Sequence, residues 1–265
     1  MVLPGPPPEL QGMWDDALAD ADVQRALADR EELRQSTLRL WGTPESELAA
    51  TLTRHEADSP DDDGLEVTTC LAQGELEIVT RYSPAAAPAY QALVAAIEAD
   101  YGDTLFSHGP SIDEVVATGL LDRGWTIATA ESCTAGLLAG RLADRAGSSA
   151  YLLGGLVTYA NDVKRDLLGV PQELLESVGA VSAEVARAMA DGARRVVGTD
   201  VGVGITGVAG PGGGTPDKPV GLVHLCVTSA DRVVAREVRL GGDRAGVRER
   251  SVVVALHLVR ELLDS

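Results

Sequence analysis

The chain has 265 residues, of which 45% are hydrophobic and only 3% aromatic, and its formal net charge at pH 7 is −18. This length is enough for one large or two medium-sized domains. The charge is unevenly distributed: residues 1–110 hold 21 acidic and 6 basic side chains, whereas residues 111–265 hold 19 and 16. We therefore expect the first part to repel nucleic acids and anionic membranes, and the second part to be able to bind a small anion locally.

The three cysteines, Cys70, Cys133 and Cys226, lie far apart and form no C-x-x-C pair, which argues against a disulfide framework and a cysteine zinc site. No His, Asp or Glu cluster has metal-ligand spacing, so we expect no metal and no cofactor. The first residues contain no basic segment followed by an apolar one, and no run approaches 18 apolar residues. We therefore expect a cytoplasmic protein without a membrane span.

The first part of the chain is predicted to form a small α+β module. Residues 1–12 are rich in proline and are expected to be extended, and an acidic helical stretch is expected from Trp14 to about Gln35. Strand, helix, strand, strand and helix then follow over residues 36–40, 44–52, 67–71, 75–81 and 86–100. The two adjacent strands are separated only by Ala72-Gln73-Gly74, which is typical of a hairpin. The loop before them covers residues 58–64.

From residue 111 on, strands and helices alternate regularly. The predicted helices span residues 112–123, 135–143, 162–168, 173–178, 184–197 and 244–263, and Ser182 is expected to cap the fifth of them. The predicted strands span residues 125–130, 151–159, 201–206, 220–228 and 233–240. The strand at 201–206 is apolar on both faces, as a central strand should be. The predicted fold class is therefore α/β: a three-layer α/β/α sandwich preceded by the smaller α+β domain.

Residues 126–137 lead from an apolar strand into a helix. Ser132, Cys133 and Thr134 are expected at the helix N-terminus, where unpaired N–H groups and the helix dipole favour negative charge. An oxygen or sulfur nucleophile at this position would have oxyanion donors beside it. The alternative is that Ser132 or Thr134 merely caps the helix, and this segment alone does not decide between the two.

Lys164 lies just beyond the end of the predicted strand 151–159 and is one of only two lysines, the other being Lys218. A lysine acts as a base when burial or neighbouring cations lower its pKa, and Ser–Lys pairs are an alternative to Ser-His-Asp. Taken alone, a solvated helix lysine is the more common situation.

A histidine-based triad is the rival to a Ser–Lys pair. His224 falls in a predicted strand and His257 in the last helix, while His55 and His108 belong to the acidic part. No G-x-S-x-G motif surrounds Ser132, so these histidines are interpreted as core or surface residues.

A glycine-rich segment, residues 206–215, leaves the carboxyl end of the central strand, where open α/β sheets bind ligands. It lacks the ending of a P-loop, and the G-x-G-x-x-G letters at 202–207 form the strand itself, so neither a nucleoside triphosphate nor a dinucleotide site is expected. Its glycines could bring N–H groups close to an anion, and a flexible loop is the alternative.

Arg244 and Arg248 lie four residues apart at the start of the last predicted helix, and hence on one face. They could contact a phosphate, or they could form an ordinary salt-bridged surface with Glu249.

Four blocks carry a resemblance to a known family: residues 130–136 (AESCTAG), 158–164 (TYANDVK), 179–182 (GAVS) and 204–213 (GITGVAGPGG). In this order they resemble the C-terminal domain of the CinA (competence/damage-inducible) family, a nicotinamide-nucleotide amidohydrolase or NMN deamidase domain, over residues 111–265. Residues 36–107 resemble the KH-like middle domain of that family. Residues 1–35 resemble a linker and the last residues of a molybdopterin-binding-like domain that is otherwise missing, so its pyrophosphatase activity is expected to be absent.

The resemblance implies a Ser/Lys hydrolase that converts nicotinamide mononucleotide (NMN) and water to nicotinate mononucleotide and ammonia. Ser132 would be the nucleophile and Lys164 the general base, and Cys133 is the competing nucleophile. The substrate-binding residues implied are Cys133, Thr134, Tyr159, Asn161, Thr206, Gly207, Gly210, Gly212 and Arg244. The expected partners are the small-molecule substrate and a second copy in a homodimer, without nucleic acid or membrane. Ala135 stands where the family usually has Gly and Ala160 where Ser is frequent, but neither removes a reacting group.

The second functional hypothesis is a non-catalytic binding or scaffold protein acting through the KH-like part. KH domains clamp nucleic acid with a GXXG loop, which residues 36–107 lack. A spacer or dimerisation role is therefore expected for this part.

Overall fold

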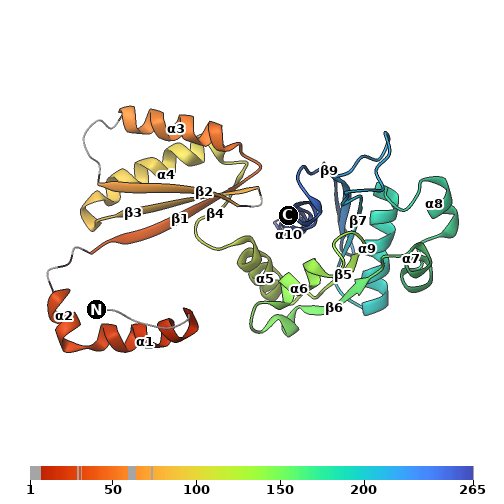
Figure 1. The fold of residues 1–265 in the computed structure, drawn as a ribbon, viewed down its shortest axis with the longest axis horizontal. Coiled ribbons are helices and arrows are strands. Elements are labelled where there is room, and N and C mark those ends of the chain that lie inside the picture. The colour runs from red at the N-terminus through yellow and green to blue at the C-terminus, as the bar shows by residue number, and fades with distance from the viewer. Residues whose placement is uncertain (1–6, 29, 31, 59–63, 73, 265) are drawn as a thin grey trace.

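The computed structural model describes residues 7–28, 30, 32–58, 64–72 and 74–264. It contains two separate β-sheets: a four-stranded one in the order β2-β3-β1-β4 and a five-stranded one in the order β6-β5-β7-β8-β9 (Figure 1). Each sheet has its own core of buried aliphatic side chains, as expected for a chain with so few aromatic residues.

The smaller sheet is antiparallel and is covered on one face by two helices, α3 and α4 (Figure 1). Its elements are β1 (Arg34–Trp41), α3 (Glu45–Asp58), β2 (Leu65–Ala72), β3 (Glu75–Tyr82), α4 (Ala87–Tyr101) and β4 (Leu105–Ser107). The predicted hairpin is confirmed, because β2 and β3 pair along their whole length from Leu65–Tyr82 to Ala72–Glu75. Alternate residues of β3, among them Leu76 and Ile78, are buried in its core.

Two expectations for this part were wrong. The extended lead-in is helical from its seventh residue, because α1 (Pro7–Ala19) has its prolines in the first turn, where no N–H donor is needed. The acidic helical stretch ends early: α2 (Ala21–Ala26) is followed by β1, which already begins at Arg34. The structure also contains β4, which was not predicted because three residues carry no periodicity. Residues 1–6 and most of the expected loop at 58–64 lie outside the described residues.

The larger sheet is mixed and forms the centre of a three-layer α/β/α sandwich, as predicted. Strands β5 (Ile127–Glu131), β6 (Leu152–Val157) and β7 (Val201–Gly207) pair in parallel. Strand β8 (Leu222–Thr228) pairs antiparallel with both β7 and β9 (Val233–Arg239). One face carries α5 (Ile112–Arg123), α6 (Leu137–Ala143) and α10 (Arg244–Leu263); the other carries α7 (Asn161–Leu168), α8 (Gln172–Ser177) and α9 (Ala183–Val197) (Figure 1). Ser182 caps α9 as expected, since its hydroxyl accepts from Val185 N–H.

Helix α9 packs directly on the central strand β7. A Cβ atom added at Gly202 or Gly204 would lie only 2.1 Å from the carbonyl oxygen of Ala190 or Ala186, respectively. These glycines therefore serve helix–strand packing, and the G-x-G-x-x-G letters are part of a buried strand and not a dinucleotide-binding turn.

The carboxyl ends of the three parallel strands meet at one edge of the larger sheet. Beyond these ends, Thr158 N–H donates to Glu131 O (2.8 Å) and Ser132 N–H donates to Ile205 O (2.9 Å). The segments that follow β5, β6 and β7 are thereby joined to one another, and they carry most of the residues singled out in the sequence.

Candidate active site

Ser132 lies in a turn and not at the start of a helix. Strand β5 ends at Glu131 and α6 begins only at Leu137, so the expectation that Ser132, Cys133 and Thr134 begin the helix was wrong. The reason is the backbone: Ala135 and Gly136 have φ angles of 52° and 92°, in the left-handed region that a helix does not tolerate. We refer to residues 132–136, which contain the candidate nucleophile Ser132, as the nucleophile turn.

Lys164 reaches this turn from α7, on the opposite face of the sheet from α6. Its Nζ lies 3.1 Å from Ser132 Oγ, 2.9 Å from Thr158 O and 3.0 Å from Tyr159 O. The side chain is only 1% exposed, so it is not a solvated helix lysine. Burial lowers the pKa of Lys164, and among the described residues no carboxylate pairs with it.

Cys133 is also buried, and its environment differs from that of a reactive cysteine. Burial is the main cause that raises its pKa to about 11, and the negative charge of Glu131 adds to the effect. The backbone N–H groups of Cys133 and Thr134 and the charge of Arg248 act in the opposite direction but are outweighed. The thiol is therefore protonated at neutral pH.

Glu131 was not singled out in the sequence, although it is the one carboxylate at the end of an otherwise uncharged strand. It is completely buried and accepts four hydrogen bonds, from Thr129 Oγ1 and from the N–H groups of Gly136, Leu138 and Ala139. A charged residue within a buried strand was the signal that could have revealed it.

Two arginines at the start of α10 bind to the same region. Arg248 donates from Nε to Cys133 O (3.1 Å) and from Nη2 to Thr134 O (2.9 Å). Arg244 donates to Gly210 O (2.8 Å) and to the hydroxyl of Tyr159 (3.1 Å). Both arginines line a cavity of about 670 Å³ between α10 and the glycine-rich segment, and their described contacts are to carbonyl and hydroxyl oxygens.

The remaining predicted residues are less closely connected to Ser132. The hydroxyl of Thr206 donates to Ala180 O (2.7 Å), which ties the segment after α8 to the end of β7. Gly210 contributes its carbonyl to Arg244, and Gly207 ends β7. Asn161, at the start of α7, and Gly212 are both exposed.

The histidines do not join this group. His224 is buried on β8, with Nδ1 3.9 Å from Glu237, and His257 is buried where α10 meets the smaller sheet. Over the part of the chain that the structure describes, no three His, Cys, Asp or Glu side chains are grouped as metal ligands.

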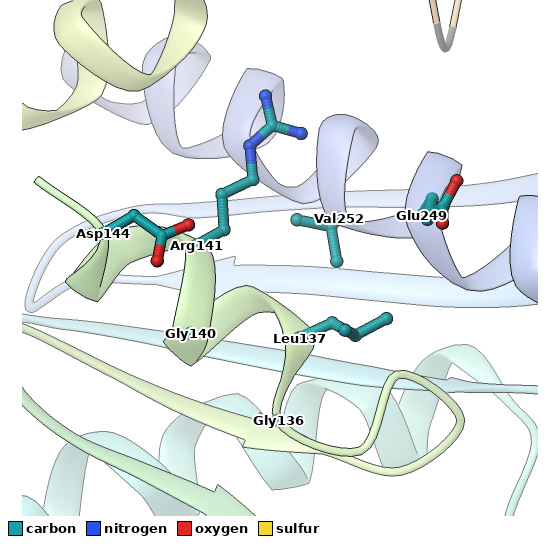
Figure 2. Close-up of a pocket in the computed structure, with 7 residues that line it drawn as sticks. All are labelled: Gly136, Leu137, Gly140, Arg141, Asp144, Glu249 and Val252. Atoms are coloured by element: carbon teal, nitrogen blue, oxygen red, sulfur yellow. The ribbon is translucent and has the colours of Figure 1, made fainter. Parts of the chain in front are cut away.

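A second cavity, of about 390 Å³, lies on the other side of the nucleophile turn, between α6 and α10. Figure 2 shows its lining residues: Gly136, Leu137, Gly140, Arg141, Asp144, Glu249 and Val252. Arg141 is held from outside by Asp113, with Nε and Oδ1 2.7 Å apart. Neither Ser132 nor Lys164 lines this cavity or the one lined by Arg244 and Arg248. The latter is connected to the turn that contains Ser132 through Arg248, which binds the carbonyl groups of Cys133 and Thr134.

The sequence profile of the CinA C-terminal domain matches residues 110–263, which is more than half of the chain. The chain belongs to the CinA family. A CinA-like protein of Mycobacterium sp. (strain MCS) is 56% identical over 266 residues, covering 100% of this chain and 63% of the relative. A CinA-like protein of Mycobacterium tuberculosis (strain ATCC 25177 / H37Ra) is 52% identical over 266 residues, covering 100% and 61%.

The chain thus spans less than two thirds of the length of these CinA relatives. Among solved structures, competence/damage inducible protein CihA from Agrobacterium tumefaciens is 43% identical with a TM-score of 0.56, covering 60% of this chain and 100% of that one. A CinA superfamily protein from Klebsiella pneumoniae is 34% identical with a TM-score of 0.56, covering 58% and 99%. None of the helices in the described ranges has the length and apolar character needed to cross a membrane.

Proposed function

We propose that this CinA-family chain hydrolyses the carboxamide of NMN to nicotinate mononucleotide and ammonia, with Ser132 as nucleophile and Lys164 as general base. The observation that carries the proposal is the set of partners around Lys164 Nζ. A neutral amine has two N–H donors and one lone pair, and two of its three neighbours are carbonyl oxygens, of Thr158 and Tyr159. The lone pair is then directed to the third neighbour, the Ser132 hydroxyl at 3.1 Å.

The low exposure of Lys164 supports the same assignment. Desolvation lowers its pKa, so a larger fraction of the amine is neutral at a given pH than in water. Ser–Lys pairs act in this way in other hydrolases, where the amine removes the hydroxyl proton as the oxygen attacks.

The reaction would proceed through an acyl-enzyme. Ser132 Oγ attacks the carboxamide carbon while its proton passes to Lys164, and the carbonyl oxygen becomes an oxyanion. The N–H groups of Cys133 and Thr134 are the nearest candidates to hold this charge, because they follow Ser132 directly in the chain; without substrate they face the Cys133 sulfur, a weak acceptor. Lys164 then protonates the departing nitrogen as ammonia, and water, deprotonated by Lys164, hydrolyses the ester to the carboxylate.

The cavity lined by Arg244 and Arg248 supports a nucleotide as substrate. Its volume of about 670 Å³ is in the range of small-molecule sites, and it combines two guanidinium groups with the N-terminus of the long helix α10. Each arginine uses only two of its five N–H donors in the contacts described, which leaves donors for the phosphate. The predicted homodimer and cytoplasmic location stay predictions.

The test is ammonia release from NMN by the wild type and by the variants Ser132→Ala, Lys164→Met and Cys133→Ala. We expect Ser132→Ala and Lys164→Met to lower kcat by at least about 10²-fold, and Cys133→Ala to retain most of it. Ser148→Ala is the matched serine control, since this side chain contacts only Ala143 O. Full turnover by Ser132→Ala, or loss only in Cys133→Ala, would refute the assignment. A folded wild type that releases no ammonia would favour the binding or scaffold hypothesis.

A further inference from the structure

Glu131 is a buried carboxylate whose partners all belong to the chain around the nucleophile. Its Oε1 accepts from Thr129 Oγ1 (3.0 Å) and Ala139 N–H (2.9 Å), and its Oε2 accepts from Gly136 N–H (3.0 Å) and Leu138 N–H (3.1 Å). An ionised carboxylate is an acceptor only, and four donors satisfy it. The cost of burying its charge is thereby offset without a basic partner.

The positions of these donors close the nucleophile turn into a ring. Glu131 is the last residue before the turn, and the three N–H donors begin at the last residue of the turn and continue into α6. The backbone thus leaves β5 at Glu131, passes through Ser132, and returns to the side chain of the residue from which it left. A displacement of the turn would break several of these bonds at once.

Arg248 holds the turn from the side of α10. Its two donors bind the carbonyl oxygens of Cys133 and Thr134. In a planar trans peptide the C=O and the following N–H point in opposite directions, so the Thr134 N–H is directed away from Arg248. In the same way, Ser132 O accepts from Ala135 N–H (3.2 Å), which sets the direction of the Cys133 N–H.

We propose that Glu131 is a positioning residue for Ser132: its fully buried carboxylate, hydrogen-bonded to Thr129, Gly136, Leu138 and Ala139, fixes the nucleophile turn, with Arg248 as the opposing contact. This inference rests on the proposed function, because it assumes that Ser132 is the reacting group. Glu131 does not bond to Ser132 Oγ or to Lys164 Nζ. It therefore acts through the backbone, by keeping the 3.1 Å approach of these two atoms and the orientation of the N–H groups of Cys133 and Thr134.

The test compares Glu131→Gln with the wild type. Gln has the same shape but replaces one acceptor oxygen by an NH₂ donor, so at least one backbone N–H of the turn or of α6 loses its acceptor. We expect kcat for NMN to fall by about 10²-fold, because small misplacements of a reacting group have effects of this size. KM should stay within about threefold, and the inflection of the pH profile should not move, because burial and not Glu131 lowers the pKa of Lys164.

The matched control is Glu114→Gln. Glu114 also accepts hydrogen bonds from a turn before a helix, at Ser111 ahead of α5, but it lies away from Ser132. We expect this variant to keep the wild-type kcat.

A graded variant, Thr129→Val, removes one of the four donors and retains the shape of the side chain. We expect it to lower kcat by about 3–10-fold, and it decides the question if Glu131→Gln does not fold.

A second readout does not depend on NMN. A fluorophosphonate modifies a reactive serine when Oγ displaces fluoride from phosphorus and its proton passes to the base. Labelling of Ser132 should slow in Glu131→Gln in proportion to kcat. If the wild type released no ammonia from NMN, the proposed function would fail, while the labelling rates would still decide this inference.

Three results would overturn the inference. The first is a wild-type kcat and labelling rate in folded Glu131→Gln. If Glu131→Gln does not fold, the same result in folded Thr129→Val has the same meaning. The second is a shifted pH inflection, which would mean that Glu131 acts on the charge of Lys164. The third is a wild-type Ser132 that the fluorophosphonate does not label.

Discussion

Trp41 and His257 stack face to face, with ring centroids 4.0 Å apart and planes inclined by only 6°, although one belongs to the smaller sheet and the other to the last helix. His257 is completely buried there, with the Phe106 ring nearly perpendicular to its own and Nε2 2.6 Å from Glu75 Oε1. The two parts of the chain are thus joined by a titratable group.

This contact predicts a loss of stability in acid. Burial lowers the pKa of His257, and the opposing effect of Glu75 is smaller. The unfolded chain binds the proton near pH 6.5 and the folded chain only at lower pH, so stability falls as the pH decreases below about 6.5. Each kcal/mol lost lowers Tm by about 2–4 °C.

Melting curves between pH 7.5 and 5.5 test this expectation. His257→Gln should flatten the dependence of Tm on pH, because the titrating group is gone. Equal slopes for His257→Gln and the wild type would show that another group is responsible.

The backbone of the nucleophile turn predicts a stabilising substitution. Ala135 is the only non-glycine residue with positive φ among those described, at 52°. An alanine in the left-handed conformation destabilises the folded state by about 1–2 kcal/mol. Replacing it with glycine removes this strain, but glycine has more conformational freedom in the unfolded chain, which offsets part of the gain. We expect Ala135→Gly to raise the free energy of unfolding by about 1 kcal/mol in urea titrations. The opposite sign is expected for Ala188→Gly, inside α9, and a loss in both variants would contradict the argument.

The buried amine predicts a pH dependence of catalysis. The pKa of Lys164 lies below its ordinary value of 10.5, and only the neutral amine accepts a proton. The kcat for NMN should therefore rise with pH to a plateau, and the midpoint of the rise should lie below pH 10.5. Lys164→Arg should be inactive at every pH, because a guanidinium stays protonated. A profile that is flat from pH 5.5 to 9.5, together with amine chemical shifts that show Lys164 to be protonated over this range, would argue against Lys164 as the base.

Burial also predicts which cysteine reacts with an alkylating agent. Cys70 is exposed, whereas Cys133 and Cys226 are buried with pKa values raised to about 11. Iodoacetamide at pH 7.5 should modify Cys70 in the folded protein and all three thiols in urea, as peptide mass analysis would show. Rapid modification of native Cys133 would indicate a thiolate and restore it as a nucleophile candidate.

Much of the fold could be predicted from local patterns. The helices α5 and α10 have the predicted bounds, because each begins at a capping residue, Ser111 or Asp243, followed by a long amphipathic or apolar stretch. Strand β4 was missed because it is defined only by its pairing with β1, which lies more than 60 residues earlier. The start of α6 was misplaced because alanine at a left-handed φ leaves no mark in the sequence.

The sequence by itself determined the order of the elements, the α/β class and, through four ordered blocks, the resemblance to the CinA family. It also drew attention to Ser132 and Lys164 by their residue type and their place after strands. Only the tertiary structure decided that these two side chains meet, that Lys164 is buried against two carbonyl groups, and that Glu131 and Arg248 hold the turn between them. The physical reason is that burial, pKa and hydrogen bonding depend on which strand ends lie side by side, and that neighbourhood is set by the packing of the whole sheet.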